Sequence, residues 1–109
     1  MVDFDDRELL ALLKQGSLEA YEILFKKYYS LLCLQANILL KNDAEAEDVV
    51  QELFVEIWDK KIYKHIDRSL KAYLYCTVKN RCLNLIKKNK LIRERLKSYD
   101  ETQSTKKDP

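Results

Sequence analysis

The chain has 109 residues, of which 47% are hydrophobic and 35% charged, so it is long enough for one soluble domain with its own core. It contains one glycine, Gly16, and one proline, Pro109, which excludes glycine-rich phosphate loops and β-sandwiches built on many tight turns. The net charge of +2 conceals a division: residues 1–59 carry 5 basic and 13 acidic side chains, net −8, whereas residues 60–109 carry 15 and 5, net +10. Such a division indicates two partners of opposite charge, or a polyanion held by the basic half.

Targeting and cysteine patterns bear on location and cofactors. No apolar run approaches the length of a membrane span, and the N-terminus is acidic with no apolar signal core, so we expect a cytoplasmic protein. The three cysteines, Cys33, Cys76 and Cys82, are odd in number and spaced for neither a disulfide framework nor a zinc site. We expect no metal and no cofactor.

The first predicted helices are separated by clear boundary residues. A short helix follows Asp5 or Asp6 and ends near Gly16, which suits a left-handed C-terminal position. Ser17 can cap a second helix over about residues 18–40, whose apolar residues recur at steps of three and four. Asn42, with Glu45 three residues later, resembles a capping arrangement for the next helix.

The third predicted helix, about residues 43–61, carries an apolar stripe and an acidic stripe. The apolar residues are Val49, Val50, Leu53, Phe54, Ile57 and Trp58, of which we expect Phe54 and Trp58 to lie in the core. The acidic residues are Glu45, Asp48, Glu52, Glu56 and Asp59. We interpret the acidic stripe as solvated or facing a partner.

The C-terminal half consists of a basic connector and a basic helix. Residues 60–68 show no clean period, and Ser69 can cap a fourth helix that keeps its apolar period to Ile86. From Ser98 the sequence is polar and aperiodic, which predicts a disordered tail. We therefore expect an all-α domain over residues 1–97, a bundle of about four helices, and a linker or tail over residues 98–109.

The sequence lacks the patterns typical of an active site. It contains no nucleophile elbow, phosphate loop or Cys-x-x-Cys motif, so we predict that the protein is not an enzyme. Two acidic pairs, Glu45 with Asp48 and Glu52 with Glu56, resemble metal ligands of helical bundles, but the Glu-x-x-His motif of such sites does not occur.

A basic segment with interleaved aromatic residues is the stronger signal. Residues 60–97 contain 13 Lys and Arg against only Asp67 and Glu94, with Tyr63, Tyr73 and Tyr75 among them. Lysine and arginine neutralise phosphates, and aromatic faces stack on unpaired bases. We favour nucleic-acid binding over a basic, solvated helix without a partner.

Two segments resemble the motifs of a known family. Residues 43–58, Asp-Ala-Glu-Ala-Glu-Asp-Val-Val-Gln-Glu-Leu-Phe-Val-Glu-Ile-Trp, resemble the A-E-D-x-x-Q-E-x-F-x-x-x-W signature of bacterial sigma factors. Residues 70–86 resemble the family's pattern of an aromatic residue, a basic-Asn pair and a basic helix end. Residues 6 to about 95 together are similar to the second conserved region of an extracytoplasmic-function (ECF) sigma factor.

The resemblance implies two partners, core RNA polymerase and promoter DNA. In that family the second region binds the clamp helices of the beta-prime subunit and captures the minus-ten element as single-stranded DNA. The polymerase contacts are then Asp48, Gln51, Glu52 and Glu56. The connector around residues 63–69 matches the loop that traps a flipped base, and the helix after it adds contacts. The predicted DNA contacts are Tyr63, Lys64, His65, Arg68, Lys71, Tyr75, Lys79, Asn80, Arg81, Lys87 and Lys88.

The chain also departs from the family pattern. ECF sigma factors carry a further domain, the fourth region, and this chain ends before one, so we expect a truncated factor or a naturally short one. Asn84 stands where an acidic residue is common. An anti-sigma factor is a further candidate partner, and we expect a monomer. The alternatives are a helical adaptor whose two charged faces bind other proteins and, more weakly, a metal-binding bundle.

Overall fold

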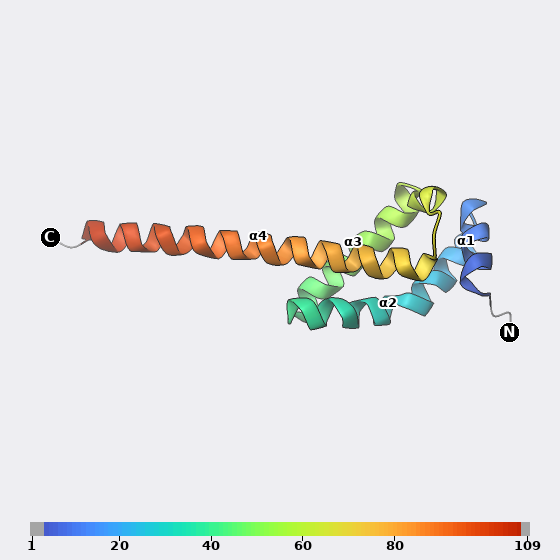
Figure 1. Ribbon diagram of the computed structural model, residues 1–109, viewed down its shortest axis with the longest axis horizontal. Coiled ribbons are helices and arrows are strands. Elements are labelled where there is room, and N and C mark those ends of the chain that lie inside the picture. Colours follow the sequence, from blue (N-terminus) through green and yellow to red (C-terminus); the bar gives the residue numbers. More distant parts are fainter. Residues whose placement is uncertain (1–3, 108–109) are drawn as a thin grey trace.

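The computed structural model describes the backbone of residues 4–107 and the side chains of residues 4–99. The described backbone forms α1 (Asp6–Lys14), α2 (Leu18–Leu40), α3 (Asp43–Asp59), the short 3-10 helix η1 (Ile62–His65) and α4 (Leu70–Lys107), with no strand (Figure 1). The predicted all-α fold is therefore confirmed. Over the residues described, none of these helices combines the length and apolarity that crossing a membrane requires.

Polar side chains cap the four α-helices where the sequence predicts them. The first backbone N–H groups of a helix have no partner inside it, so a side-chain oxygen just before the helix stabilises its start. The four caps are Asp5 to the amide of Glu8 at 2.9 Å, Ser17 to that of Ala20 at 3.1 Å, Asn42 to that of Glu45 at 3.0 Å and Ser69 to that of Ala72 at 3.3 Å.

Residues with a left-handed backbone conformation lie in the turns between elements. Gly16 has a φ of 84° after α1, as the sequence predicts. Lys41 and Lys61 also adopt positive φ, 55° and 51°, at the end of α2 and before η1. The turn at Lys41 is short, and α2 and α3 run in opposite directions beside one another (Figure 1).

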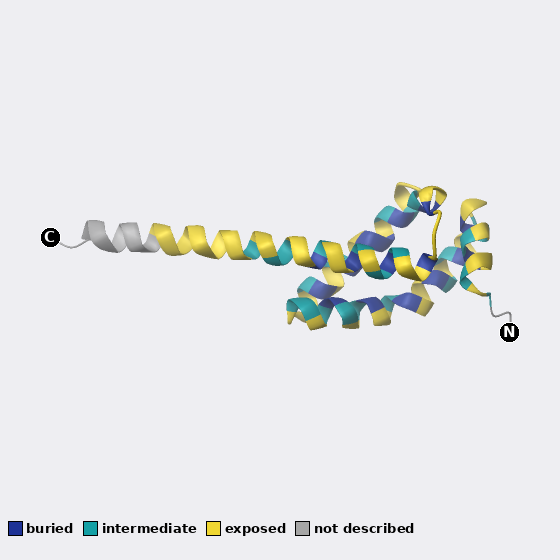
Figure 2. Cartoon of the chain, viewed as in Figure 1, coloured by how far each residue is buried: buried dark blue, intermediate teal, exposed yellow. Residues whose placement is uncertain are grey.

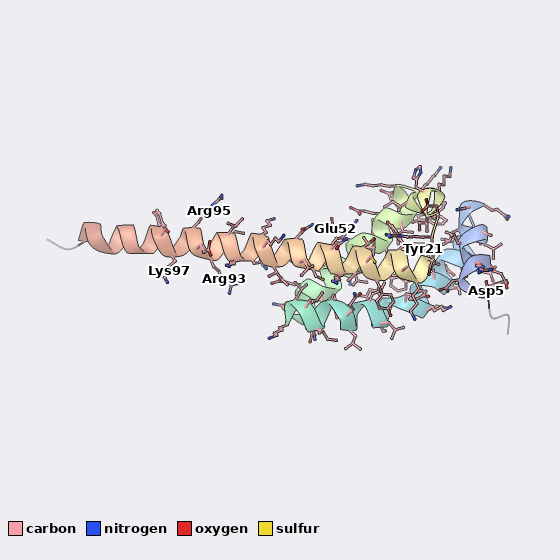
Figure 3. The ribbon with its side chains drawn as sticks, in the orientation of Figure 1. Asp5, Tyr21, Glu52, Arg93, Arg95 and Lys97 are labelled. Carbon is pink, nitrogen blue, oxygen red and sulfur yellow. The ribbon has the colours of Figure 1, made fainter. Side chains whose placement is uncertain are left out.

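The core lies where α2, α3 and the first part of α4 pack together (Figure 2). Its buried residues are Leu9, Leu13, Ala20, Leu24, Tyr28, Leu32, Ala36, Ala46, Val50, Leu53, Phe54, Ile57, Tyr63, Ile66, Leu70, Leu74, Val78 and Cys82. Phe54 is buried and Trp58 packs against this cluster, as predicted. The Tyr21 hydroxyl (Figure 3) donates to the Phe54 carbonyl at 2.8 Å and so joins α2 to α3.

Charged and polar contacts attach the remaining parts to this core. Asp6 on α1 accepts hydrogen bonds from Lys27 Nζ at 2.7 Å and from the Tyr28 hydroxyl, which ties α1 to α2. Gln35 Nε2 donates to the Tyr75 carbonyl at 3.1 Å and ties α2 to α4. These contacts hold the first half of α4 in a fixed position against α2.

The second half of α4 extends away from the bundle and makes the molecule elongated, 73 × 23 × 20 Å (Figure 1). Residues 91–99 are all exposed, and Figure 3 shows Arg93, Arg95 and Lys97 on this extension. The sequence predicts disorder from Ser98, whereas the helical backbone continues to Lys107. No glycine or proline interrupts residues 70–107, and lysine, arginine, leucine and glutamate favour helix without tertiary contacts.

Candidate functional site

The acidic face of α3 presents most of the predicted polymerase contacts to solvent. Asp48, Gln51 and Glu52 are exposed, while the neighbouring Val50 and Leu53 are buried and fix the helix against the core. Gln51 Nε2 donates to the Tyr29 hydroxyl at 2.9 Å, which places Gln51 on the side of α3 that faces α2. Three of the four predicted side chains are therefore available to a partner from a rigid helix.

A groove of about 570 Å³ separates α3 from α4. Its walls are Glu45, Asp48, Val49, Glu52 and Glu56 from α3, and Arg81, Asn84, Leu85, Lys88 and Asn89 from α4. Glu52 is labelled in Figure 3, close to where α4 crosses α3. The acidic stripe of one helix and basic residues of the other thus line a single concave surface.

Glu56 and Arg81 form an ion pair across this groove. Their side chains are 20% and 30% exposed, so the contact is partly shielded from water. The hydrogen bond from Arg81 holds the pKa of Glu56 below its usual value. Lys60 Nζ lies 3.6 Å from the other Glu56 oxygen. Two residues predicted to contact different partners therefore contact each other.

Tyr63 does not lie where the sequence predicts it. It is 3% exposed, and its ring centroid lies 6.3 Å from that of Trp58, so it belongs to the core and not to a DNA-binding surface. The physical reason is the 3-10 turn of η1, in which residues three apart lie on one side. Tyr63 and Ile66 share that spacing and are both buried, a signal that the sequence contains and that our prediction missed.

The other predicted DNA contacts fall on the connector and on three different faces of α4. Lys64 and His65 are exposed on η1, and Arg68 is exposed with its guanidinium 6.0 Å from the Tyr73 ring. On α4 the steps of four place Lys71, Tyr75 and Lys79 on one face, and Tyr75 is half-buried against the ring of Tyr28. Arg81 and Lys88 line the groove, whereas Asn80 and Lys87, seven residues apart, are exposed on a separate face. The structure does not bring all of them together.

Several groove residues were absent from the sequence-based prediction. Asn84, Leu85 and Asn89 line the groove, and Asn89 Nδ2 donates to Glu45 Oε2 at 3.2 Å. Their spacing from Arg81 at steps of three and four is a visible helical stripe. The sequence alone does not show which helix that stripe faces.

The described residues contain no group of three or more His, Cys, Asp or Glu side chains that could hold a metal ion. The acidic pairs that raised the metal-binding interpretation are instead directed to the groove or to solvent. In this part of the chain the metal-binding interpretation therefore gains no support.

Comparison with known families identifies the fold. The family model described as sigma-70 region 2 matches residues 24–92, which is more than half of the chain. The matched span covers most of α2, all of α3 and η1, and α4 as far as Ile92, so it includes the whole groove. Searches of curated proteins and of solved structures gave no match. The chain therefore belongs to the sigma-70 region 2 family.

Proposed function

We propose that this chain is the domain of an ECF-type sigma factor that joins core RNA polymerase to single-stranded promoter DNA. Membership of the sigma-70 region 2 family gives it a role in transcription initiation, in a family of transcription factors that are not enzymes. In the proposal, α3 binds the beta-prime clamp helices, while η1 and α4 bind and help to melt the minus-ten element. The observation that carries it is the family match over residues 24–92.

The exposed face of α3 supports the polymerase contact. Asp48 and Glu52 are four residues apart and Gln51 lies beside them, so the three side chains lie within about one helical turn. The helix that bears them is packed into the core, so a partner binds a surface that is already ordered. Little conformational entropy is therefore lost from this chain on binding. A cationic or polar helix of the polymerase would complement this face.

The basic face of α4 supports the DNA contact. Lys71 and Lys79 flank the half-buried Tyr75 on one face, a combination of cations and an aromatic ring that suits an unpaired strand. Extruding a base costs a few kcal/mol, and stacking together with phosphate contacts can offset that cost. Because Tyr63 is buried, the connector contributes Lys64, His65 and Arg68 rather than a tyrosine ring.

Binding to core RNA polymerase is the deciding experiment. The double variant Asp48→Asn with Glu52→Gln removes two negative charges from α3, and we expect the dissociation constant to rise at least about tenfold. The matched control, Glu19→Gln with Glu22→Gln, removes the same charge from exposed positions on α2 and should leave the affinity unchanged. Failure of the unaltered chain to bind polymerase would refute the proposal.

Salt dependence tests the DNA contact separately. With polymerase present, the chain should prefer a single strand to the matching duplex. Lys71→Ala and Lys79→Ala should each reduce the log–log salt slope by about 0.7, the value for one phosphate contact on a single strand. Salt-sensitive binding to proteins without any strand preference would instead identify a helical adaptor.

Further expectations accompany this proposal. The boundary between a domain over residues 1–97 and a linker stays a prediction, as do the cytoplasmic location, the monomeric state and a contact with an anti-sigma factor. Each follows from the sequence and from the proposed function.

A further inference from the structure

The contact between Glu56 and Arg81 joins the two surfaces that the proposed function keeps apart. Glu56 belongs to the acidic face of α3, and Arg81 to the basic helix α4. Since the planar guanidinium group matches a carboxylate, the pair is well suited to hold each partner in place. In the free chain each of the two charges is therefore neutralised by the other.

The groove around this pair is open to a competing group. It has a volume of about 570 Å³, and Asp48, Glu52 and Lys88 on its walls are exposed. A partner that docks on the acidic face of α3 therefore reaches the oxygens of Glu56 from this groove. Arg81 is 30% exposed, so its guanidinium can turn toward solvent without leaving the protein surface.

Neighbouring groups lower the free-energy cost of separating the pair. Lys60 Nζ lies 3.6 Å from Glu56, so the carboxylate keeps a cation nearby when Arg81 leaves. A DNA phosphate offers Arg81 charge-assisted hydrogen bonds of the same kind as the one that Glu56 Oε2 accepts from it. Neither group is then left desolvated and unpaired, which is the costly outcome for a shielded charge.

We propose that the Glu56–Arg81 ion pair is a latch that couples polymerase binding to DNA binding. In the free chain Glu56 occupies Arg81; docking of polymerase on α3 takes up Glu56 and releases Arg81 to a phosphate of the single strand. The latch rests on the proposed function, because it requires both partners. Since coupling between two binding sites is reciprocal, DNA binding at Arg81 also raises the affinity for polymerase.

The latch predicts effects of opposite sign for the two partners. Glu56→Gln releases Arg81 and should bind DNA about three- to fivefold more tightly, while it binds polymerase more weakly. Arg81→Ala frees Glu56 and should bind polymerase more tightly, while it binds DNA more weakly. An ion pair that only stabilises the fold would weaken binding of both partners or leave both unchanged.

Matched variants separate the latch from a general effect of charge. Asp59→Asn removes one negative charge from an exposed position on α3, and Lys90→Ala removes one positive charge from an exposed position on α4. We expect neither to reproduce the opposed effects. Glu56→Asp keeps the charge but shortens the side chain by one methylene, and should reproduce most of the gain in DNA affinity.

The experiment measures two affinities for each variant of the full chain. Fluorescence anisotropy with a labelled single-stranded oligonucleotide of random sequence gives the DNA affinity without polymerase, over a series of salt concentrations. Glu56→Gln should steepen the log–log salt slope by about 0.7, which corresponds to one added phosphate contact. Binding to core RNA polymerase without DNA gives the second affinity, and circular dichroism verifies that each variant is folded.

Three results are informative. Opposed changes in Glu56→Gln and Arg81→Ala, with the DNA gain of Glu56→Gln abolished by adding Arg81→Ala, support the latch. Equal DNA gains in Glu56→Gln and Asp59→Asn, or changes of the same sign for both partners, overturn the latch and leave the proposed function intact. Absence of polymerase binding by every protein, the unaltered chain included, overturns the proposed function and the latch with it.

Discussion

Truncating Tyr63 to alanine separates a core residue from a binding residue. The sequence places this side chain in a loop that contacts DNA, whereas the structure packs it from η1 against Trp58 with 3% of its surface exposed. We therefore expect Tyr63→Ala to lower the stability of the domain. Any loss of DNA binding would follow from unfolding and not from a missing contact.

The magnitude follows from burial. Replacing a large aromatic residue in a core by alanine typically costs about 3–5 kcal/mol, through lost burial and the cavity that remains. A domain of this length has a total stability of roughly 5–15 kcal/mol. The variant should thus lose a large fraction of it. At about 4 °C per kcal/mol for this size, the melting temperature should fall by roughly 12–20 °C.

The protein contains its own reporter for this measurement. Trp58 is the only tryptophan, and its ring lies 5.1 Å from that of Tyr21 and 6.3 Å from that of Tyr63. Its fluorescence during urea unfolding reports on the core without a contribution from the exposed half of α4. His65→Ala, an exposed position in the same turn, should change the stability by less than about 0.5 kcal/mol.

Two patterns of results would refute this reasoning. If Tyr63→Ala kept the urea midpoint of the unaltered chain and lost single-strand binding, the ring would act on DNA directly. A stable variant with unchanged binding would show that the packing around Trp58 is dispensable. The expected outcome is a lower midpoint in Tyr63→Ala and a nearly unchanged one in Tyr63→Phe.

Three further changes test local features of the fold. Burial raises the pKa of Asp6, but hydrogen bonds from Lys27 and Tyr28 outweigh it and lower the pKa. The stabilisation that this carboxylate provides is therefore fully present above about pH 4 and is lost as the pH falls through its lowered pKa. In a series of urea unfolding curves measured at decreasing pH, Asp6→Asn should reduce the fall of the midpoint at acid pH. Gly16→Ala meets no atom within 4 Å but must adopt a φ of 84°, so calorimetry should show a loss of about 1 kcal/mol. Asn42→Ala removes the cap of α3 and should also cost about 1 kcal/mol by urea unfolding.

Features governed by local chemistry were predictable from the sequence. Asp5, Ser17, Asn42 and Ser69 cap helices because a short polar side chain reaches the free amides three residues later, wherever the helix lies in the fold. The helical backbone of α4 continues past Ser98, and local chemistry accounts for this as well. A polar composition argues against a packed core, but it does not prevent a run without glycine or proline from forming helix.

Contacts between distant segments were not predictable in the same way. Glu56 and Arg81 are 25 residues apart, and both carry the residue type expected of a contact with an external partner. Only the packing of α3 against α4 shows that each is the other's partner. The hydrogen bond between Asn89 and Glu45, which are 44 residues apart, is a second such contact further along the groove.

This pairing changes what the charge division of the sequence implies. The acidic first half and the basic second half face each other across one groove, so part of their charge is neutralised within the molecule. The predicted DNA contacts include seven Lys and Arg residues. Lys71 and Lys79 lie on one face of α4 and Lys87 lies on another, while Arg81 is paired with Glu56. A single strand that follows the face of Lys71 meets two or three of these cations at once. At about −0.7 per contact, the salt slope of the free chain should therefore lie between about −1.4 and about −2, whereas a slope near about −5 would mean that all seven reach the strand.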